Sequence, residues 1–103
     1  MLLVIDVGNT NITFGVYQEK VLETTFRVTT KIPRTSDEYG FTVRELLRNN
    51  NISSKEIEGC IIASVVPNVM HALVNAIKRY IGVEPLIVGP GIKTGIKIVS
   101  ENP

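Results

Sequence analysis

The chain has 103 residues, of which 44% are hydrophobic and 20% are charged. This length and composition predict one globular domain and argue against a disordered chain. Eleven Lys and Arg residues against ten Asp and Glu residues leave a net charge of +1, and no nucleic-acid partner is expected, because such binding normally needs clustered basic residues. A single cysteine excludes an internal disulfide and a zinc cluster built from cysteines.

The chain begins with a strand-like apolar run, Leu2–Val7, and its start lacks the basic segment and the long apolar stretch of a signal peptide or membrane span. We therefore expect a cytoplasmic protein with no membrane partner. Two more strands are predicted over Asn11–Tyr17 and Val21–Val28. The connections between these three strands are short enough for antiparallel hairpins.

A helix is predicted to begin after Thr35, because Thr35 and Glu38 have the spacing of a capping box. Asp37 and Glu38 could be metal ligands, but acidic residues favour the first turn of a helix through its dipole, so a capping role is preferred. The helix is expected to end at Asn49–Asn51. Its apolar stripe consists of Tyr39, Val43, Leu46 and Leu47.

The second half of the chain alternates apolar runs with a second helix. Cys60, which opens an apolar run, is interpreted as a small buried side chain, and His71 as a surface or partly packed helical residue. The expected elements are a strand at Ile61–Val66 covered on both faces, a helix from Pro67 to the residue before Gly82, a buried strand at Leu86–Val88, a glycine-rich segment at Gly89–Gly95 and an extended piece at Ile96–Val99.

This order of elements predicts an α/β fold with a mixed sheet, in which three antiparallel strands continue into parallel strands through crossover helices. Ligands of such sheets bind at the carboxyl ends of the strands. Asp6, Ser64 and Gly89 would all lie near those ends, and Asp6 and Ser64 could approach each other there. Ser64 has no adjacent general base, so chemistry based on a serine nucleophile has little support.

The most informative segment is Asp6–Thr10, where a carboxylate at the end of a buried strand is followed by a glycine turn and small hydrogen-bonding side chains. Such a turn can hold a hydrated metal and a phosphate chain. The alternative is that Asp, Gly and Asn simply form a good turn. Taken alone, the segment leaves both interpretations open.

The segment Gly89–Gly95 is rich in glycine but does not match a Walker loop, because Ile92 rather than glycine precedes Lys93. It also lacks the following helix of a dinucleotide-binding fingerprint. A plain loop is one interpretation. A ligand role is the other, because the segment follows an apolar strand and carries a cation and a hydroxyl.

Four motifs in one order carry a resemblance that covers essentially the whole chain. They are Asp6–Thr10 with Gly15, Arg34–Tyr39, Ser64–Pro67 and Gly89–Gly95. In these motifs the chain resembles the N-terminal part of a type III pantothenate kinase, a family in the superfamily of acetate kinase, sugar kinases, actin and heat-shock chaperones. The resemblance implies a ribonuclease H-like sheet and ATP-dependent phosphorylation of the 4′-hydroxyl of pantothenate, the first step of coenzyme A synthesis.

The resemblance also implies a dimer that uses ATP, Mg²⁺ and a monovalent cation, K⁺ or NH₄⁺. Asp6 would orient the metal and its waters. The residues carried over for ATP and phosphate binding are Asp6, Val7, Gly8, Asn9, Thr10, Asn11, Ile12 and Thr13. Those carried over for pantothenate are Gly89, Gly91, Lys93, Thr94 and Ser100, where Ser100 stands at the position of an aromatic residue in many members.

The family's catalytic aspartate lies in a Gly-x-Asp-Arg motif shortly after an Asn-Pro pair, and this chain ends at Asn102-Pro103. The resemblance therefore implies that residues 1–103 are the ATP- and phosphate-binding domain of an incomplete kinase. No catalytic residue is expected within the chain. The second domain would be missing, and the chain alone would be inactive.

Two other functions compete with the kinase interpretation. The first is a non-catalytic nucleotide-sensing or regulatory module of the same superfamily, which would lack Gly-x-Asp-Arg after Pro103. The second is a small interaction domain whose glycine loops are only turns. In that domain, an Asp6→Asn change would leave nucleotide titrations unaltered.

Overall fold

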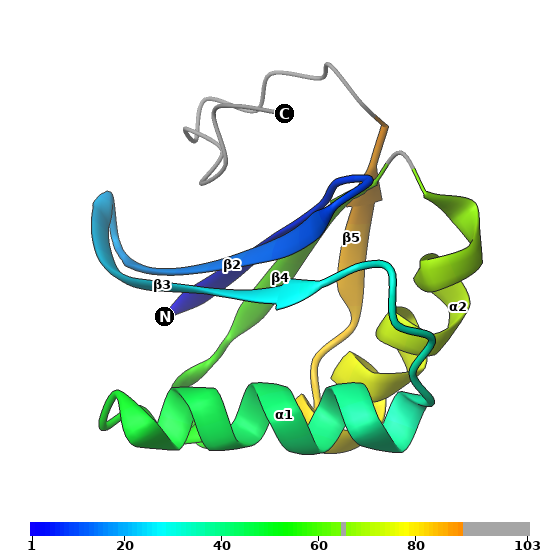
Figure 1. The fold of residues 1–103 in the computed structure, drawn as a ribbon. Coiled ribbons are helices and arrows are strands. Elements are labelled where there is room, and N and C mark those ends of the chain that lie inside the picture. The colour runs from blue at the N-terminus through cyan, green and yellow to red at the C-terminus, as the bar shows by residue number, and fades with distance from the viewer. Residues whose placement is uncertain (65, 90–103) are drawn as a thin grey trace.

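The computed structural model describes residues 1–64 and 66–89 (Figure 1). The elements alternate between strands and helices after three initial strands. They are β1 (Leu2–Val7), β2 (Asn11–Gln18), β3 (Val21–Thr29), α1 (Ser36–Asn49), the 3₁₀ turn η1 (Ser54–Glu56), β4 (Gly59–Ser64), α2 (Pro67–Ala76), the π-helical turn η2 (Ile77–Ile81) and β5 (Pro85–Val88).

The five described strands form one sheet in the order β3-β2-β1-β4-β5. The pairs β1–β2 and β2–β3 are antiparallel, whereas β1–β4 and β4–β5 are parallel. The predicted α/β fold with a mixed sheet is thereby confirmed. Because β1, β4 and β5 run in the same direction, the carboxyl ends of these strands and the β1–β2 turn lie at the same end of the sheet (Figure 1).

The core lies between one face of the sheet and the helices, which Figure 1 shows on the same side of the sheet. Alternate residues of β1 and β2 point toward the helices and are almost fully buried, as period-two patterning requires. The main contributors from the strands are Leu3, Ile5, Val7, Ile12, Phe14 and Val16, and those from the helices are Tyr39, Val43, Leu47, Leu73 and Ile77.

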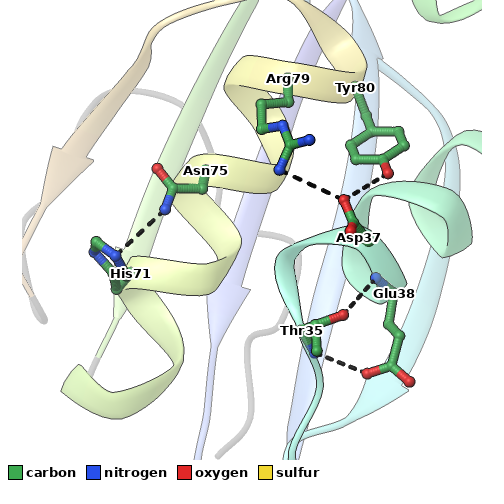
Figure 2. Close-up of polar contacts among 7 residues, drawn as sticks. All are labelled: Thr35, Asp37, Glu38, His71, Asn75, Arg79 and Tyr80. Carbon is green, nitrogen blue, oxygen red and sulfur yellow. Dashed lines mark hydrogen bonds and ion pairs between the residues drawn. The ribbon is translucent and has the colours of Figure 1, made fainter.

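Helix α1 begins where the capping box predicts. The Thr35 hydroxyl accepts a hydrogen bond from the Glu38 backbone N–H at 3.1 Å, and the Glu38 carboxylate accepts one from the Thr35 N–H at 2.8 Å (Figure 2). The carboxylate of Glu38 is therefore occupied by the cap. Asp37 is also engaged, since it accepts a hydrogen bond from the Tyr80 hydroxyl at 2.7 Å and lies 3.5 Å from Arg79 (Figure 2).

Helix α1 contacts the end of the second helix at a glycine. A Cβ added at Gly40 would lie 2.1 Å from Cδ1 of Tyr80, so the ring occupies the space that any other side chain would fill. The Arg44 guanidinium lies 5.8 Å from the centre of the same ring. The missing Cβ of Gly40 thus lets the Tyr80 ring lie against α1.

Predictions for the second helix hold in part. The chain reverses at Gly82, whose left-handed φ of 87° ends the helix as expected, but the last turn, Ile77–Ile81, is π-helical. His71 is exposed, with its Nε2 atom 3.4 Å from Nδ2 of Asn75 (Figure 2). Cys60 is buried as predicted, and burial raises the pKa of its thiol to about 12.

The predictions for the last two described strands need correction. The fourth strand spans Gly59–Ser64 rather than Ile61–Val66, and it is not fully covered on both faces, because Ile61 and Ala63 are only half-buried. The expectation that Leu86–Val88 is buried is wrong, because Leu86 and Ile87 are 61% and 49% exposed. The physical reason is that β5 lies at the edge of the described sheet and pairs only with β4. The extended piece predicted at Ile96–Val99 lies outside the described residues.

Candidate phosphate-binding site

Asp6 lies one residue before the end of β1, on the face of the sheet opposite the helices. It is in register with Thr13 on β2 and with Ala63 on β4, so the three side chains share that face. Asp6 is half-buried, and burial raises the pKa of its carboxyl group above the ordinary value. Thr13 beside it is only 4% exposed. The site thus offers a partly desolvated carboxylate near the carboxyl ends of the parallel strands.

The turn that follows Asp6 depends on a close backbone approach. The Gly8 N–H donates to the Asn11 carbonyl at 2.9 Å, and a Cβ on Gly8 would lie 3.1 Å from the same oxygen. Any other residue at position 8 would push this carbonyl away. Asn9, Thr10 and Asn11 are exposed, which leaves their side chains accessible to a ligand.

Two of the residues predicted to bind phosphate have side chains that point into the core. Val7 and Ile12 are 1% and 0% exposed, and they pair with each other across β1 and β2. Only their backbone groups could contact a ligand. The predicted set, residues 6–13, therefore contains three kinds of residue. Asn9, Thr10 and Asn11 are exposed in the turn, Asp6 has the Thr13 hydroxyl beside it, and Val7 and Ile12 anchor the hairpin in the core.

The segment after β3 holds this turn in place, which sequence reasoning missed. The Thr30 hydroxyl donates to the Gly8 carbonyl at 2.9 Å, and the Thr30 N–H donates to the Thr10 carbonyl at 2.8 Å. A register shift between Val16 and Tyr17 places Thr29 opposite Asn11. Counting back from the β2–β3 turn without this shift would place Val28, not Thr29, opposite Asn11. The sequence therefore offered no direct sign that Thr30 contacts the turn.

Arg34 in turn holds the Thr29–Thr30 segment. Its Nη1 atom donates to the Thr29 carbonyl at 2.6 Å, and its guanidinium carbon lies 5.9 Å from the centre of the Tyr39 ring. Tyr39 is 2% exposed and belongs to the core. A chain of contacts thus connects the core of α1 to the turn after Asp6.

Ser64 does not face Asp6, contrary to expectation. It is in register with Val7, whose side chain points to the helix face, whereas Asp6 points to the other face. The Ser64 hydroxyl instead bonds the backbone of Val66, accepting from its N–H at 2.9 Å and lying 3.2 Å from its carbonyl. Ser64 therefore shapes the approach to α2.

The glycine-rich segment is described only at its first residue. Gly89 is exposed and directly follows β5, so the segment begins at the same end of the sheet as Asp6. The other residues assigned to pantothenate, namely Gly91, Lys93, Thr94 and Ser100, lie outside the described residues.

Among residues 1–64 and 66–89, no helix is long and apolar enough to cross a membrane.

Solved structures with a similar arrangement include two proteins described as sugar kinases. The fold matches the ROK hexokinase of Thermus thermophilus with a TM-score of 0.62 at 14% identity, over 85% of this chain and 33% of the other. It matches a Porphyromonas gingivalis protein described as an N-acetylglucosamine kinase with a TM-score of 0.61 at 18% identity, over 86% of this chain and 34% of the other. RuvC of T. thermophilus gives a TM-score of 0.55 at 20% identity, over 86% of this chain and 61% of the other. These likenesses support the ribonuclease H-like fold.

Sequence relatives are much closer. Over all 103 residues the chain is 52% identical to the type III pantothenate kinases of Agathobacter rectalis and of Listeria innocua, and it spans 40% of the length of each. The sequence profile of that family matches residues 2–103. A match over nearly every residue, on a fold shared with sugar kinases, leaves one assignment: this chain is a member of the type III pantothenate kinase family.

Proposed function

We propose that residues 1–103 are the N-terminal, ATP- and phosphate-binding domain of an enzyme that phosphorylates pantothenate on its 4′-hydroxyl, the first step of coenzyme A synthesis. Family membership supports the reaction. The observation that carries the phosphate-binding role is the placement of the half-buried Asp6 directly before a tight glycine turn with exposed donors.

Phosphoryl transfer depends on positioning and charge neutralisation more than on covalent help from the protein. The turn suits this task because Asn9 and Thr10 are exposed and carry side-chain and backbone groups that can donate to a phosphate chain. Gly8 permits the close approach that shapes the turn. Thr13, which is almost fully buried, pairs with Asp6 across β1 and β2 and places a hydroxyl beside the carboxylate.

The donor set fits Mg²⁺ bound mainly through water and phosphate. Mg²⁺ commonly uses one or two carboxylates plus substrate oxygens rather than an all-protein cage. Asp6 supplies one carboxylate, and no cluster of three or more His, Cys, Asp or Glu residues lies among the described residues. When bound, Mg²⁺ would neutralise charge on the phosphates. Asp6 would hold and orient the metal and its waters.

The remaining parts of the proposal concern groups beyond the described site. The segment from Gly89, with Gly91, Lys93, Thr94 and Ser100, would contribute to the pantothenate pocket. The general base would be an aspartate after Pro103, so the chain alone would be inactive. The monovalent cation, K⁺ or NH₄⁺, the homodimer and the cytoplasmic location are proposed on the same basis of family membership.

The test is ADP release by the full-length protein, with and without pantothenate, in potassium and in sodium buffer. We expect release that requires pantothenate and potassium, and we expect Asp6→Asn to abolish it. Asp37→Asn is the matched control, because Asp37 is an exposed carboxylate in contact with Tyr80 and Arg79. ATP binding without pantothenate-dependent release would favour a nucleotide-sensing module. Absence of ATP binding would refute the phosphate-binding role.

A further inference from the structure

We infer that Arg34 is a positioning residue for the phosphate-binding turn, residues 8–11, and that it acts through Thr30. This inference rests on the proposed function, since the turn is the part assigned to the phosphates. Arg34 lies outside residues 6–13 and is only half-buried, but its contacts connect that turn to the core.

The first step of the connection is the guanidinium itself. Nη1 of Arg34 donates to the Thr29 carbonyl at 2.6 Å, a hydrogen bond strengthened by the positive charge. The planar group also lies over the Tyr39 ring at 5.9 Å, and that ring is fixed in the core at 2% exposure. Arg34 therefore fixes the end of β3 relative to α1.

The second step is the pair of hydrogen bonds that Thr30 donates to the turn. Its hydroxyl and its N–H donate to the carbonyls of Gly8 and Thr10, at 2.9 Å and 2.8 Å. In a planar trans peptide the C=O and the following N–H point in opposite directions. Holding these two carbonyls toward β3 therefore turns the N–H groups of Asn9 and Asn11 away from it. The orientation of the donors offered to a phosphate chain follows from the position of Thr30.

Lysine cannot reproduce this role. Its ammonium is a compact charge that could still bond a carbonyl, but it lacks the planar group that stacks on an aromatic ring and fixes the direction of the bond. Arg34→Lys thus keeps the charge and loses the geometry. Thr30→Val removes the hydroxyl with little change of shape.

Arg44→Lys provides a matched control. Arg44 also lies over a tyrosine ring, that of Tyr80 at 5.8 Å, and it is exposed on α1. The Tyr80 ring belongs to the contact between the two helices, whereas the Tyr39 ring below Arg34 belongs to the core under the turn. A loss caused simply by removing an arginine–tyrosine pair would appear in both lysine variants.

The experiment measures the affinity of the full-length protein for ATP with Mg²⁺ by calorimetry, together with hydrogen exchange at the Gly8 and Thr30 amides, which donate to the Asn11 and Thr10 carbonyls. We expect Arg34→Lys and Thr30→Val each to weaken ATP binding about tenfold. The double variant should be weaker than either single one by no more than about twofold, because both act through one path. The KM for pantothenate should not change, and Arg44→Lys should bind ATP like the wild type.

Wild-type ATP affinity in Arg34→Lys, or an equal loss in Arg44→Lys, would overturn the inference. If the wild-type protein binds no ATP, the proposed function fails, and hydrogen exchange without nucleotide then decides about Arg34. Faster exchange at Gly8 and Thr30 in Arg34→Lys than in Arg44→Lys would support its positioning role. Equal exchange in the two variants would refute it.

Discussion

Replacing Gly40 by alanine tests the contact between α1 and the end of the second helix. The added Cβ would lie 2.1, 2.4 and 2.7 Å from Cδ1, Cγ and Cε1 of Tyr80, distances that real Cβ atoms essentially never show. Cγ is close to the backbone of Tyr80, so a small rotation of the ring cannot relieve the overlap. The ring must leave its place over α1, or the two helices must separate.

The expected sign depends on two opposing effects. Alanine in a helix interior is favoured over glycine by about 1 kcal/mol. Overpacking a filled site costs about 1–3 kcal/mol, and displacing the ring also removes its hydrogen bond to Asp37. We therefore expect Gly40→Ala to lower the free energy of unfolding by about 1–2 kcal/mol. For a domain of this size the Tm falls by roughly 4–8 °C for each kcal/mol.

The assay is urea unfolding followed by circular dichroism, in the wild-type background and in Tyr80→Ala. Without the ring the overlap is gone, so Gly40→Ala should become neutral or stabilising by up to about 1 kcal/mol. The difference between the two backgrounds measures the contact directly. An increase in stability in the wild-type background, or an equal loss in both, would refute the reasoning.

Three further results are expected. Gly82→Ala should lower the free energy of unfolding by about 1 kcal/mol, because φ is 87° and, within the described part of the chain, no atom lies within 4 Å of the added Cβ to offset the strain. Gly82→Asn should lose less stability, and equal losses in urea unfolding would contradict this. The Cys60 thiol should resist Ellman's reagent at pH 8 until the protein unfolds, since burial raises its pKa to about 12; rapid labelling of folded protein would count against it. Asp6→Asn should raise the Tm of nucleotide-free protein at pH 7, because burial raises the pKa of Asp6 and disfavours its charged form. In the wild type, the stability that comes from the protonated Asp6 carboxyl is complete only below the ordinary pKa of about 3.9 and is lost as the pH rises through the raised pKa of the folded protein. The Tm gain of Asp6→Asn should therefore vanish in melts at low pH.

Local chemistry along the chain determined where the two helices begin and end. Thr35 and Glu38 are three residues apart, and their reciprocal hydrogen bonds need no distant partner, so the start of α1 was predictable. Gly82 ended the second helix for an equally local reason, the ease with which glycine adopts a positive φ. The turn after Asp6 was predictable for the same reason, because its residues are contiguous in sequence, whereas its role in binding phosphate stays a prediction.

Tertiary structure decided which side chains meet. The shift between Val16 and Tyr17 sets the partner of every later residue of β3, and it brings Thr30 to the carbonyls of the turn. A one-residue difference in register reverses the faces of a strand, and no local pattern revealed that shift. The same limit explains Ser64, which the parallel pairing of β1 with β4 directs away from Asp6.

Burial at the edge of the sheet and contact between helices were decided in the same way. Leu86 and Ile87 have the apolar character of a covered strand, but exposure depends on which elements flank β5 in space. Gly40 has no local signature, and only the arrival of Tyr80 from another helix gives it a role. Sequence thus determined the elements and the chemistry of the turn through interactions a few residues long, whereas packing between distant segments decided what supports that turn.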